Sequence, residues 1–413
     1  MNINEIGRRA KDASLYSAKI STEEKNRLLF ALANDLESNI DEILTVNGED
    51  VKLAKSNGVK SAFIDRLTLN EKRVREMADG LREVAALPDP IGEMVRMNTL
   101  PNGLKVGQRR VPMGVIGIIF EARPNVTADA FGLCLKAGSA TILKGGSNAL
   151  RTNTMLVDIF RKTLSDNGAP EDLVQLISDT SYETANEMMR LNDYIDVLIP
   201  RGSGRLISSV VENSTVPVIR TGEGNCHAYV DETADIDMAI NIVLNGKVQR
   251  PGVCNALETL LVHENIADAF VPRVTKALIE RDVEVRGDAA FQKIEGVCPA
   301  REEDFATEYE DYIISCKVVK NLDEAIKHIR RYSTGHSEAI ITENYTNAQR
   351  FLDEVDSACV YVNASTRFTD GNQFGFGAEI GISTQKLHAR GPMGLKELTT
   401  TKYIIYGSGQ IRK

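Results

Sequence analysis

From Val111 onward, short apolar runs alternate with helical stretches, and no other feature limits the fold as strongly. The apolar runs cover 115–120, 140–143, 174–177, 197–199 and 216–219, with helical patterns at 126–135, 150–167, 182–191 and 205–212. Strands that are apolar along their whole length and separated by helices form parallel sheets covered on both faces. Ligands of such sheets bind at the carboxyl ends of the strands. The pattern therefore predicts an α/β architecture of a nucleotide-binding type.

A second α/β pattern begins near residue 226. Its expected strands are 259–263, 312–319, 339–341 and 359–363, with helices at 266–281, 322–332 and 346–355. We therefore expect residues 1–225 to form one domain and residues 226–364 another. Residues 365–413 are expected to return to the first domain and to end in a strand at 399–406.

The first hundred residues are predicted to be mostly helical. Ser21-Thr-Glu-Glu24 and Thr68-Leu-Asn-Glu71 are capping-box patterns, in which a side-chain oxygen accepts from the first turn of a helix. Alternation around Asn102-Gly103 predicts a β-hairpin over about 94–110. The hairpin is either an edge strand pair or an oligomerisation arm, and the last strand could pair with it in its own subunit or in a neighbour's.

Composition narrows the class of protein. The chain has 413 residues and a net charge of -9, which argues against nucleic acid or an acidic membrane as a partner over the whole surface. The six cysteines form no C-x-x-C pair and no histidine lies at zinc-ligand spacing, so we expect reduced thiols in the cytoplasm and no metal site. We expect no signal peptide, and no apolar run approaches the ~20 residues that span a bilayer.

Residues 246–258 contain the strongest candidate for a reactive side chain. Pro251-Gly252 breaks the preceding helical pattern and presents the residues that follow, among them Cys254. Two nearby cations, Lys247 and Arg250, would favour the thiolate, which is the nucleophilic form of cysteine. The alternative is that Cys254 is a small buried hydrophobe, as most free cysteines are.

Two turns after predicted strands are candidates for binding a nucleotide, although neither contains the G-x-G-x-x-G fingerprint. One turn lies between a strand and a helix, where Gly202 and Ser203 would offer the free N–H groups of the helix N-terminus to a phosphate. In the other, Lys144 stands at a strand end before Gly-Gly-Ser147 and can reach a ribose or a phosphate. The alternatives are a plain glycine-rich turn and a solvated lysine.

Together these stretches resemble the aldehyde dehydrogenase superfamily from about Val95 onward. The resemblance implies an atypical Rossmann domain for a nicotinamide cofactor in residues 1–225 and a catalytic α/β domain in residues 226–364. It also implies that the hairpin and the last strand form the oligomerisation element of a dimer or tetramer. The residues it implies are the nucleophile Cys254, the ribose-contacting Lys144, the phosphate-contacting Gly202 and Ser203, and Glu308 on the nicotinamide ribose.

Three longer motifs narrow the resemblance to one branch of that family. They are Phe120-Glu-Ala-Arg-Pro-Asn125, Arg250-Pro-Gly-Val-Cys254-Asn-Ala, and the stretch from Ala325 through His328 and His336 to Ile340. Members with these motifs use NADPH to reduce L-glutamyl 5-phosphate to L-glutamate 5-semialdehyde and phosphate, the second step of proline biosynthesis. The resemblance therefore implies this reaction, and it leaves open an association with the glutamate 5-kinase that makes the substrate.

Two departures from the wider family fit a reductase that uses NADP. The glutamate that activates water in thioester-hydrolysing members falls on Thr221 in an ungapped register, with Glu223 two residues away. A reductase has no use for that base, because hydrolysis would waste the activated substrate. Ser147 stands where NAD-preferring relatives often carry an acidic residue, which would repel the 2′-phosphate of NADP.

The expected chemistry begins with attack of Cys254 on the acyl phosphate. Backbone N–H groups near Cys254 and the amide of Asn125 are the expected donors to the oxyanion. Because the substrate carries a phosphate, a carboxylate and an amine, we expect cationic side chains around it, namely Arg123, Lys247, Arg250 and Arg367. Two rival functions remain, which are another acyl-phosphate or acyl-CoA reductase of this family and a non-catalytic binding protein on this fold.

Overall fold

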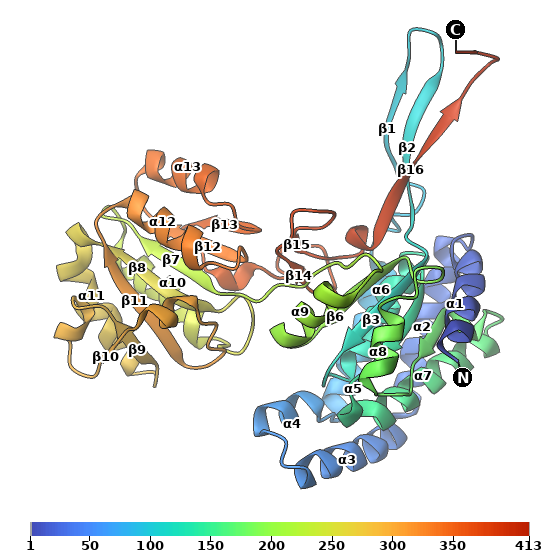
Figure 1. Ribbon diagram of the computed structural model, residues 1–413, viewed down its shortest axis with the longest axis horizontal. Helices are drawn as coiled ribbons and strands as arrows, with labels where there is room; N and C mark the ends of the chain where they lie inside the picture. The colour runs from blue at the N-terminus through green and yellow to red at the C-terminus, as the bar shows by residue number, and fades with distance from the viewer. Residues whose placement is uncertain (1, 413) are drawn as a thin grey trace. The chain divides into compact units, whose positions relative to one another are not determined.

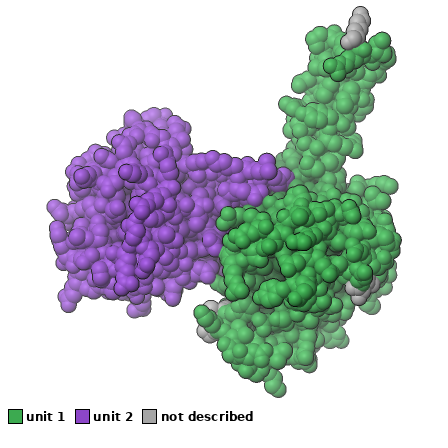
Figure 2. Space-filling model, in the orientation of Figure 1, with its two compact units in different colours: residues 1–221, 375–381, 393–413 green, residues 222–374, 382–392 purple. Residues whose placement is uncertain are grey.

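The computed structural model describes residues 2–412 (Figure 1). The chain divides into two compact units, which Figure 2 distinguishes by colour. Unit 1 comprises the chain up to Thr221, Gly375–Gly381 and the chain from Met393, and unit 2 comprises Gly222–Phe374 and Ile382–Pro392. Residue 225, after which the domain boundary was expected, thus lies inside unit 2. The chain re-enters unit 1 twice, at Gly375 and at Met393, rather than once at residue 365.

Unit 1 contains a four-stranded parallel sheet in the order β5-β4-β3-β6. Its strands are β3 (Val115–Phe120), β4 (Ala140–Lys144), β5 (Val174–Leu176) and β6 (Val197–Arg201). Each is followed by a helix, in turn α6 (Asn125–Lys136), α7 (Leu150–Asp166), α8 (Tyr182–Met188) and α9 (Gly204–Asn213). The carboxyl ends of these strands therefore carry the turns that contain the candidate cofactor residues.

The fifth expected strand, 216–219, does not form. Only a single bridge joins Leu198 of β6 to Val218. The carbonyl of Pro217 accepts from the N–H of Leu198 at 2.8 Å, but Pro217 has no N–H with which to extend the ladder. The apolar run therefore ends as an isolated bridge rather than a strand.

The first part of unit 1 is helical. The helices are α1 (Ile3–Ser17), α2 (Thr22–Ser38), α3 (Ile40–Ser56), α4 (Ser61–Leu67) and α5 (Glu71–Ala86). Ser21 caps α2 as expected, since its hydroxyl accepts from the N–H of Glu24 at 3.1 Å. The second predicted cap is wrong, because Asn70 rather than Thr68 accepts from the first turn of α5. Thr68 instead donates to the carbonyl of Ile64 at the end of α4.

An antiparallel arm completes unit 1. It consists of β1 (Met94–Thr99), β2 (Lys105–Pro112) and β16 (Thr399–Tyr406), in the order β1-β2-β16. Thr399 lies opposite Pro112 and Tyr406 opposite Lys105, so the last strand pairs with the hairpin of its own chain. Every residue of β1 is exposed, and Figure 1 shows the arm extending away from the rest of its unit. The arm carries several exposed apolar side chains, namely Met94, Val95, Met97, Tyr403, Ile405 and Tyr406.

Unit 2 contains a seven-stranded parallel sheet in the order β10-β9-β11-β8-β7-β12-β13. In that order the strands are Cys298–Pro299, Glu284–Gly287, Ile313–Val319, Leu257–His263, Cys226–Val230, Ser337–Ile341 and Cys359–Val362. Its main helices are α10 (Ile236–Val248), α11 (Glu264–Ile279), α12 (Leu322–Tyr332) and α13 (Tyr345–Glu354). A separate two-stranded antiparallel sheet consists of β14 (Ile382–Ser383) and β15 (Gly391–Pro392).

Alternate residues of the central strands of unit 2 fill two different cores. Leu260 of β8 packs into the core that contains Phe270 of α11. Its neighbour Leu261 packs into the core that contains Ile329 of α12 and Phe351 of α13. A strand with both faces buried in this way requires an uninterrupted apolar sequence, and β8 has one from Leu260 to Val262. Among the described residues, no helix is long and apolar enough to cross a membrane.

Candidate active site

Cys254 lies in the turn between the end of α10 and the start of β8. It is partly exposed, whereas Cys134, Cys226, Cys316 and Cys359 are buried. The helix ends at Val248, just before Arg250-Pro251, and the strand begins at Leu257. The turn thus presents a thiol at the amino end of the central strand β8, where it is partly exposed.

The segment that leads into β7 packs directly against this turn. A methyl group added at Gly224 would lie only 2.8 Å from the Cα of Cys254 and would overlap its carbonyl group. The N–H of Gly224 also donates to Oε1 of Glu308 at 2.8 Å. Gly224 therefore joins the candidate nucleophile and the candidate ribose-binding carboxylate, and only glycine leaves room for this approach.

Two of the predicted substrate-binding cations gather near Cys254. The Arg367 side chain donates from Nε to Oε1 of Gln249 at 2.7 Å. Burial lowers the pKa of Arg367, and the neighbouring charge of Arg250 lowers it further, while Cys254 acts in the opposite sense. Two guanidinium groups close enough to repel each other beside a thiol form a favourable place for an anion.

Lys247 departs from its predicted role. Its side chain is fully buried, and its ammonium donates to Oε2 of Glu258 at 2.6 Å. Burial raises the pKa of Glu258 to about 7 in spite of the lysine. Because α10 turns Lys247 into the unit rather than toward the turn, we do not assign it to the substrate.

Glu308 is half-buried between the short helix at Glu302–Ala306 and β11. Burial raises the pKa of its carboxyl to about 7, against the opposing effect of the N–H of Gly224. A carboxyl group with this pKa changes charge near neutral pH. It is therefore able to accept hydrogen bonds from sugar hydroxyls in a pH-dependent way.

In unit 1, Lys144 ends β4 with a buried ammonium group. It donates to the carbonyl of Asp179, in the loop after β5, at 3.0 Å. Burial lowers the pKa of Lys144, while the charge of Asp179 raises it. Ser147 is exposed at the start of the short helix Ser147–Ala149, two residues beyond Gly145. A desolvated cation beside an accessible hydroxyl suits a phosphorylated sugar.

Gly202 and Ser203 lie at the N-terminus of α9, where Ser203 is the capping residue. Glu121, which follows β3, already bonds there: its carboxylate accepts from the N–H of Ser203 at 2.9 Å and from its hydroxyl at 2.7 Å. A Cβ at Gly202 would lie 2.7 Å from the carboxyl carbon of Glu121. The free N–H groups of this helix end thus attract a carboxylate of the chain itself, as their charge predicts.

Arg123 lies in the turn between β3 and α6, Asn125 is the first residue of α6, and both are half-buried. The Asn125 amide donates one hydrogen bond to Oδ2 of Asp129, one helical turn later, at 2.8 Å. An amide has two donor hydrogens, so this bond fixes the side chain and leaves a second donor. Burial raises the pKa of Asp129 to about 6.

Thr221 and Glu223 are the two residues nearest the expected position of a water-activating glutamate. Thr221 is buried, and its hydroxyl donates to the carbonyl of Pro200 at 2.8 Å. Glu223, in unit 2, is exposed. Two histidines of the long motif are buried and packed: burial lowers the pKa of His328 to about 3 and that of His336 to about 4, so both are neutral near pH 7.

Comparisons with known proteins identify the family. The model of the aldehyde dehydrogenase family matches residues 1–313 and 300–404. The chain is 60% identical to the gamma-glutamyl phosphate reductase of Carboxydothermus hydrogenoformans over 98% of both chains, and 57% identical to that of Lachnospira eligens over the whole of both. It matches the crystal structure of the gamma-glutamyl phosphate reductase of Thermotoga maritima with a TM-score of 0.97 and 50% identity over 99% of each chain.

The chain belongs to the aldehyde dehydrogenase family, in the group of gamma-glutamyl phosphate reductases. The expected fold class is thereby confirmed. Sequence analysis assigned no role to two residues, namely Glu121 and Gly224. Glu121 is part of one of the long motifs, and no local signal marks Gly224 as a neighbour of the reactive turn. Among the cysteines other than Cys254, Cys226 was expected to be the one nearest the site, and its sulfur lies 3.2 Å from the carbonyl oxygen of Cys254.

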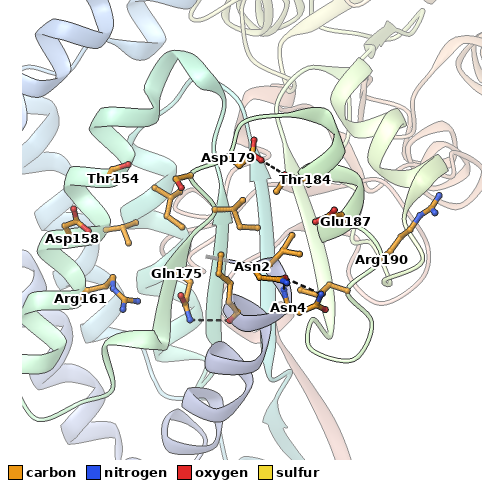
Figure 3. A pocket seen from close by; sticks show the side chains of 17 residues that line it. Asn2, Asn4, Thr154, Asp158, Arg161, Gln175, Asp179, Thr184, Glu187 and Arg190 are labelled. Atoms are coloured by element: carbon orange, nitrogen blue, oxygen red, sulfur yellow. Dashed lines mark hydrogen bonds between the residues drawn. The ribbon is translucent and has the colours of Figure 1, made fainter.

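A hollow of about 1090 Å³ lies elsewhere in unit 1, between α1, α7, the end of β5 and α8 (Figure 3). The polar side chains around it bond within the protein: Arg161 donates to the carbonyl of Val174, Gln175 to that of Ile6, and Thr184 to the carboxylate of Asp179. We assign no ligand to this hollow. No group of three or more acidic, histidine or cysteine side chains able to hold a metal occurs in the described part of the chain.

Proposed function

We propose that this chain catalyses the NADPH-dependent reduction of L-glutamyl 5-phosphate to L-glutamate 5-semialdehyde and phosphate, the second step of proline biosynthesis from glutamate. The observation that carries the proposal is that the chain is 57% or more identical, over nearly its full length, to relatives that are named gamma-glutamyl phosphate reductase. We propose that the enzyme acts in the cytoplasm, where its six cysteines, which form no C-x-x-C pair, are expected to stay reduced.

Cys254 is the proposed nucleophile. Its sulfur attacks the acyl carbon, the carbonyl oxygen becomes an oxyanion, and the bond from carbon to the phosphate oxygen then breaks to leave a thioester on Cys254. Backbone N–H groups of the turn and the second amide hydrogen of Asn125 are the proposed donors to the oxyanion. After reduction of the thioester, collapse of the thiohemiacetal releases the aldehyde and restores the thiol.

Arg250 and Arg367 are the proposed ligands of the substrate phosphate. Their mutual repulsion near Cys254 is relieved when a dianion binds between them, which favours binding of the phosphorylated substrate. Arg123, from unit 1, is proposed to contact the substrate carboxylate. Lys247 is left out, because its charge is already balanced by Glu258 inside unit 2.

The residues present fit a phosphorylated nicotinamide dinucleotide. Lys144 offers a desolvated ammonium and Ser147 an exposed hydroxyl. Gly202 and Ser203, at the start of α9, are the proposed phosphate contacts, and the N–H of Ser203 becomes available to the phosphate when the carboxylate of Glu121 is displaced from it. Glu308 offers a carboxyl group for ribose hydroxyls. When bound, this cofactor supplies the hydride that reduces the thioester. Thr221 carries no carboxylate, and its hydroxyl donates to the carbonyl of Pro200, so this residue does not supply the base that hydrolysis of a thioester requires.

The arm is the proposed oligomerisation surface of a dimer or tetramer. Its exposed apolar residues, such as Tyr403 and Ile405, lie on a three-stranded sheet whose edge strand β1 is exposed along its whole length. Exposed apolar residues beside an unpaired strand edge are features of an interface. Sedimentation of the protein and of an Ile405→Arg variant tests this: a monomer in both cases would contradict it.

The reverse reaction tests the proposed activity. Purified protein is mixed with glutamate 5-semialdehyde and NADP, with phosphate, with coenzyme A or with neither, beside a Cys254→Ala variant. We expect NADPH to form only with phosphate and only in the unmodified protein. Formation of NADPH with coenzyme A would favour an acyl-CoA reductase, and formation without either acceptor would show that the thioester is hydrolysed. No turnover by the folded protein would favour a binding protein.

A further inference from the structure

A second cysteine contacts the backbone of the candidate nucleophile. Cys226, at the start of β7, is buried, and its sulfur lies 3.2 Å from the carbonyl oxygen of Cys254 as a hydrogen-bond donor. Burial raises the pKa of Cys226 well above its ordinary value, so the group remains a thiol and keeps its proton for this bond. The contact therefore reaches the reactive turn from the neighbouring strand of the sheet.

The same sulfur begins a chain of buried polar groups. It lies 3.7 Å from Nδ1 of His336, which lies 2.8 Å from the hydroxyl of Ser337. Ser337 contacts the hydroxyl of Thr369 at 2.7 Å, and Thr369 contacts that of Tyr361 at 2.6 Å. Each of these groups is restrained by its neighbour, so Cys226 has a fixed orientation toward Cys254.

The turn is held from a second direction by the same segment that contains Thr369. The Asn255 amide donates to the carbonyl of Thr369 at 2.7 Å, and the hydroxyl of Thr366 donates to the carbonyl of Asn255 at 2.8 Å. The carbonyl of Cys254 is thus held by β7, while the next residue, Asn255, is held by the segment after β13 through its side chain and its own carbonyl. These contacts on both sides restrain the backbone from which the sulfur of Cys254 projects.

We propose that Cys226 is a positioning residue for the reaction: its thiol donates to the carbonyl of Cys254 and so aims the nucleophile at the acyl carbon. The inference rests on the proposed role of Cys254. Positioning of this kind acts on the chemical step, because the reacting atoms must approach within a narrow range of distance and angle. Alanine at this position removes the donor, whereas serine retains one in nearly the same place.

The test compares Cys226→Ala, Cys226→Ser and a matched control, Cys316→Ala, which removes another buried thiol from β11 of the same sheet. For each variant, kcat, KM for the semialdehyde, Tm, and the rate at which iodoacetamide alkylates Cys254 are measured. We expect the alanine variant to lose kcat by about tenfold with KM nearly unchanged, and serine to restore most of it. The control is expected to keep the kcat of the unmodified protein while losing as much Tm as Cys226→Ala.

Two results would overturn the inference: an alanine variant with the kcat of the control, or serine and alanine variants that are equally impaired. A fall in Tm alone, with kcat and the alkylation rate unchanged, would show that Cys226 only fills the core. The Cys254→Ala variant separates this from failure of the proposed function. If that variant retains activity, Cys254 is not the nucleophile, whatever the Cys226 variants show.

Discussion

Replacing Gly224 with alanine is expected to disable the enzyme without unfolding it. The new methyl group would lie 2.8 Å from the Cα of Cys254 and nearer still to its carbonyl group, whereas real Cβ atoms essentially never approach closer than 3.0 Å. The obstructing atoms belong to the backbone and cannot rotate away. The turn that carries Cys254 must therefore move by about 1 Å or more, and such a displacement of a reacting group can cost about 100-fold in rate.

The stability cost is expected to be much smaller than the loss of rate. Overpacking by one methyl group in a protein interior typically costs about 1–3 kcal/mol. The turn precedes the amino end of β8, where Cys254 is partly exposed, so we expect it to shift without opening the core between β8 and α11. We therefore expect a variant that is folded at room temperature and whose kcat is about 100-fold lower.

The assay is phosphate-dependent formation of NADPH from glutamate 5-semialdehyde, with circular dichroism to follow folding. Gly246→Ala is the matched control: it lies in α10 of the same unit, and the nearest atom to its new methyl group is in the side chain of Leu257, at 3.1 Å, rather than in the backbone. Alanine also favours a helix by about 0.5–1 kcal/mol over glycine, so this control is expected to remain active and stable. A Gly224→Ala variant with the kcat of the control would refute the close packing described here.

Three further changes test other parts of the site. Burial raises the pKa of Glu308 to about 7, so its carboxylate forms as the pH rises from about 6 to 8. The Kd for NADPH, measured by fluorescence titration, should fall over that range. Glu308→Gln should remove this pH dependence of the Kd. Arg367→Gln should raise KM for the acyl phosphate by about tenfold or more in steady-state kinetics and leave the Kd for NADPH unchanged. Burial raises the pKa of Asp129 from 3.8 to about 6. The stability that the neutral carboxyl contributes to the folded protein is therefore fully present below pH 3.8 and is lost as the pH rises through 6. Asp129→Asn should accordingly raise Tm above about pH 6 and leave it unchanged near about pH 4.

The sequence predicted an element accurately where residues next to it in the chain mark both of its ends. The strand at 115–120 and the helix at 322–332 were predicted to the residue, because the first lies between Gly114 and the charged Glu121, and Asn321 caps the second by accepting from the N–H of Glu324. The strand β7 was missed, since its sequence includes the polar His227. That residue is buried in a strand that lies between β8 and β12, and its backbone N–H donates to Glu338 of β12, 111 residues later in the chain, at 2.8 Å.

The site shows the same division between local and distant causes. Pro251-Gly252 indicated from the sequence alone that Cys254 lies on a turn, and the structure places it there. Lys247 was expected to favour the thiolate and to contact the substrate, but its ammonium donates to Glu258 in the interior of the unit. Glu121 contacts a serine 82 residues away, and Cys226 contacts a carbonyl 28 residues away. No periodicity or motif within one segment encodes such contacts, which depend on the order of strands in each sheet.

Direct detection of the thioester tests the central claim, that Cys254 forms the covalent intermediate. The protein is incubated with glutamate 5-semialdehyde and NADP without phosphate, stopped in acid, digested and analysed by mass spectrometry. We predict that the peptide containing Cys254 gains the mass of one glutamyl group, that phosphate added before the acid removes it, and that Cys254→Ala acquires none. A glutamyl group on another residue, or one that phosphate does not release, would contradict the account.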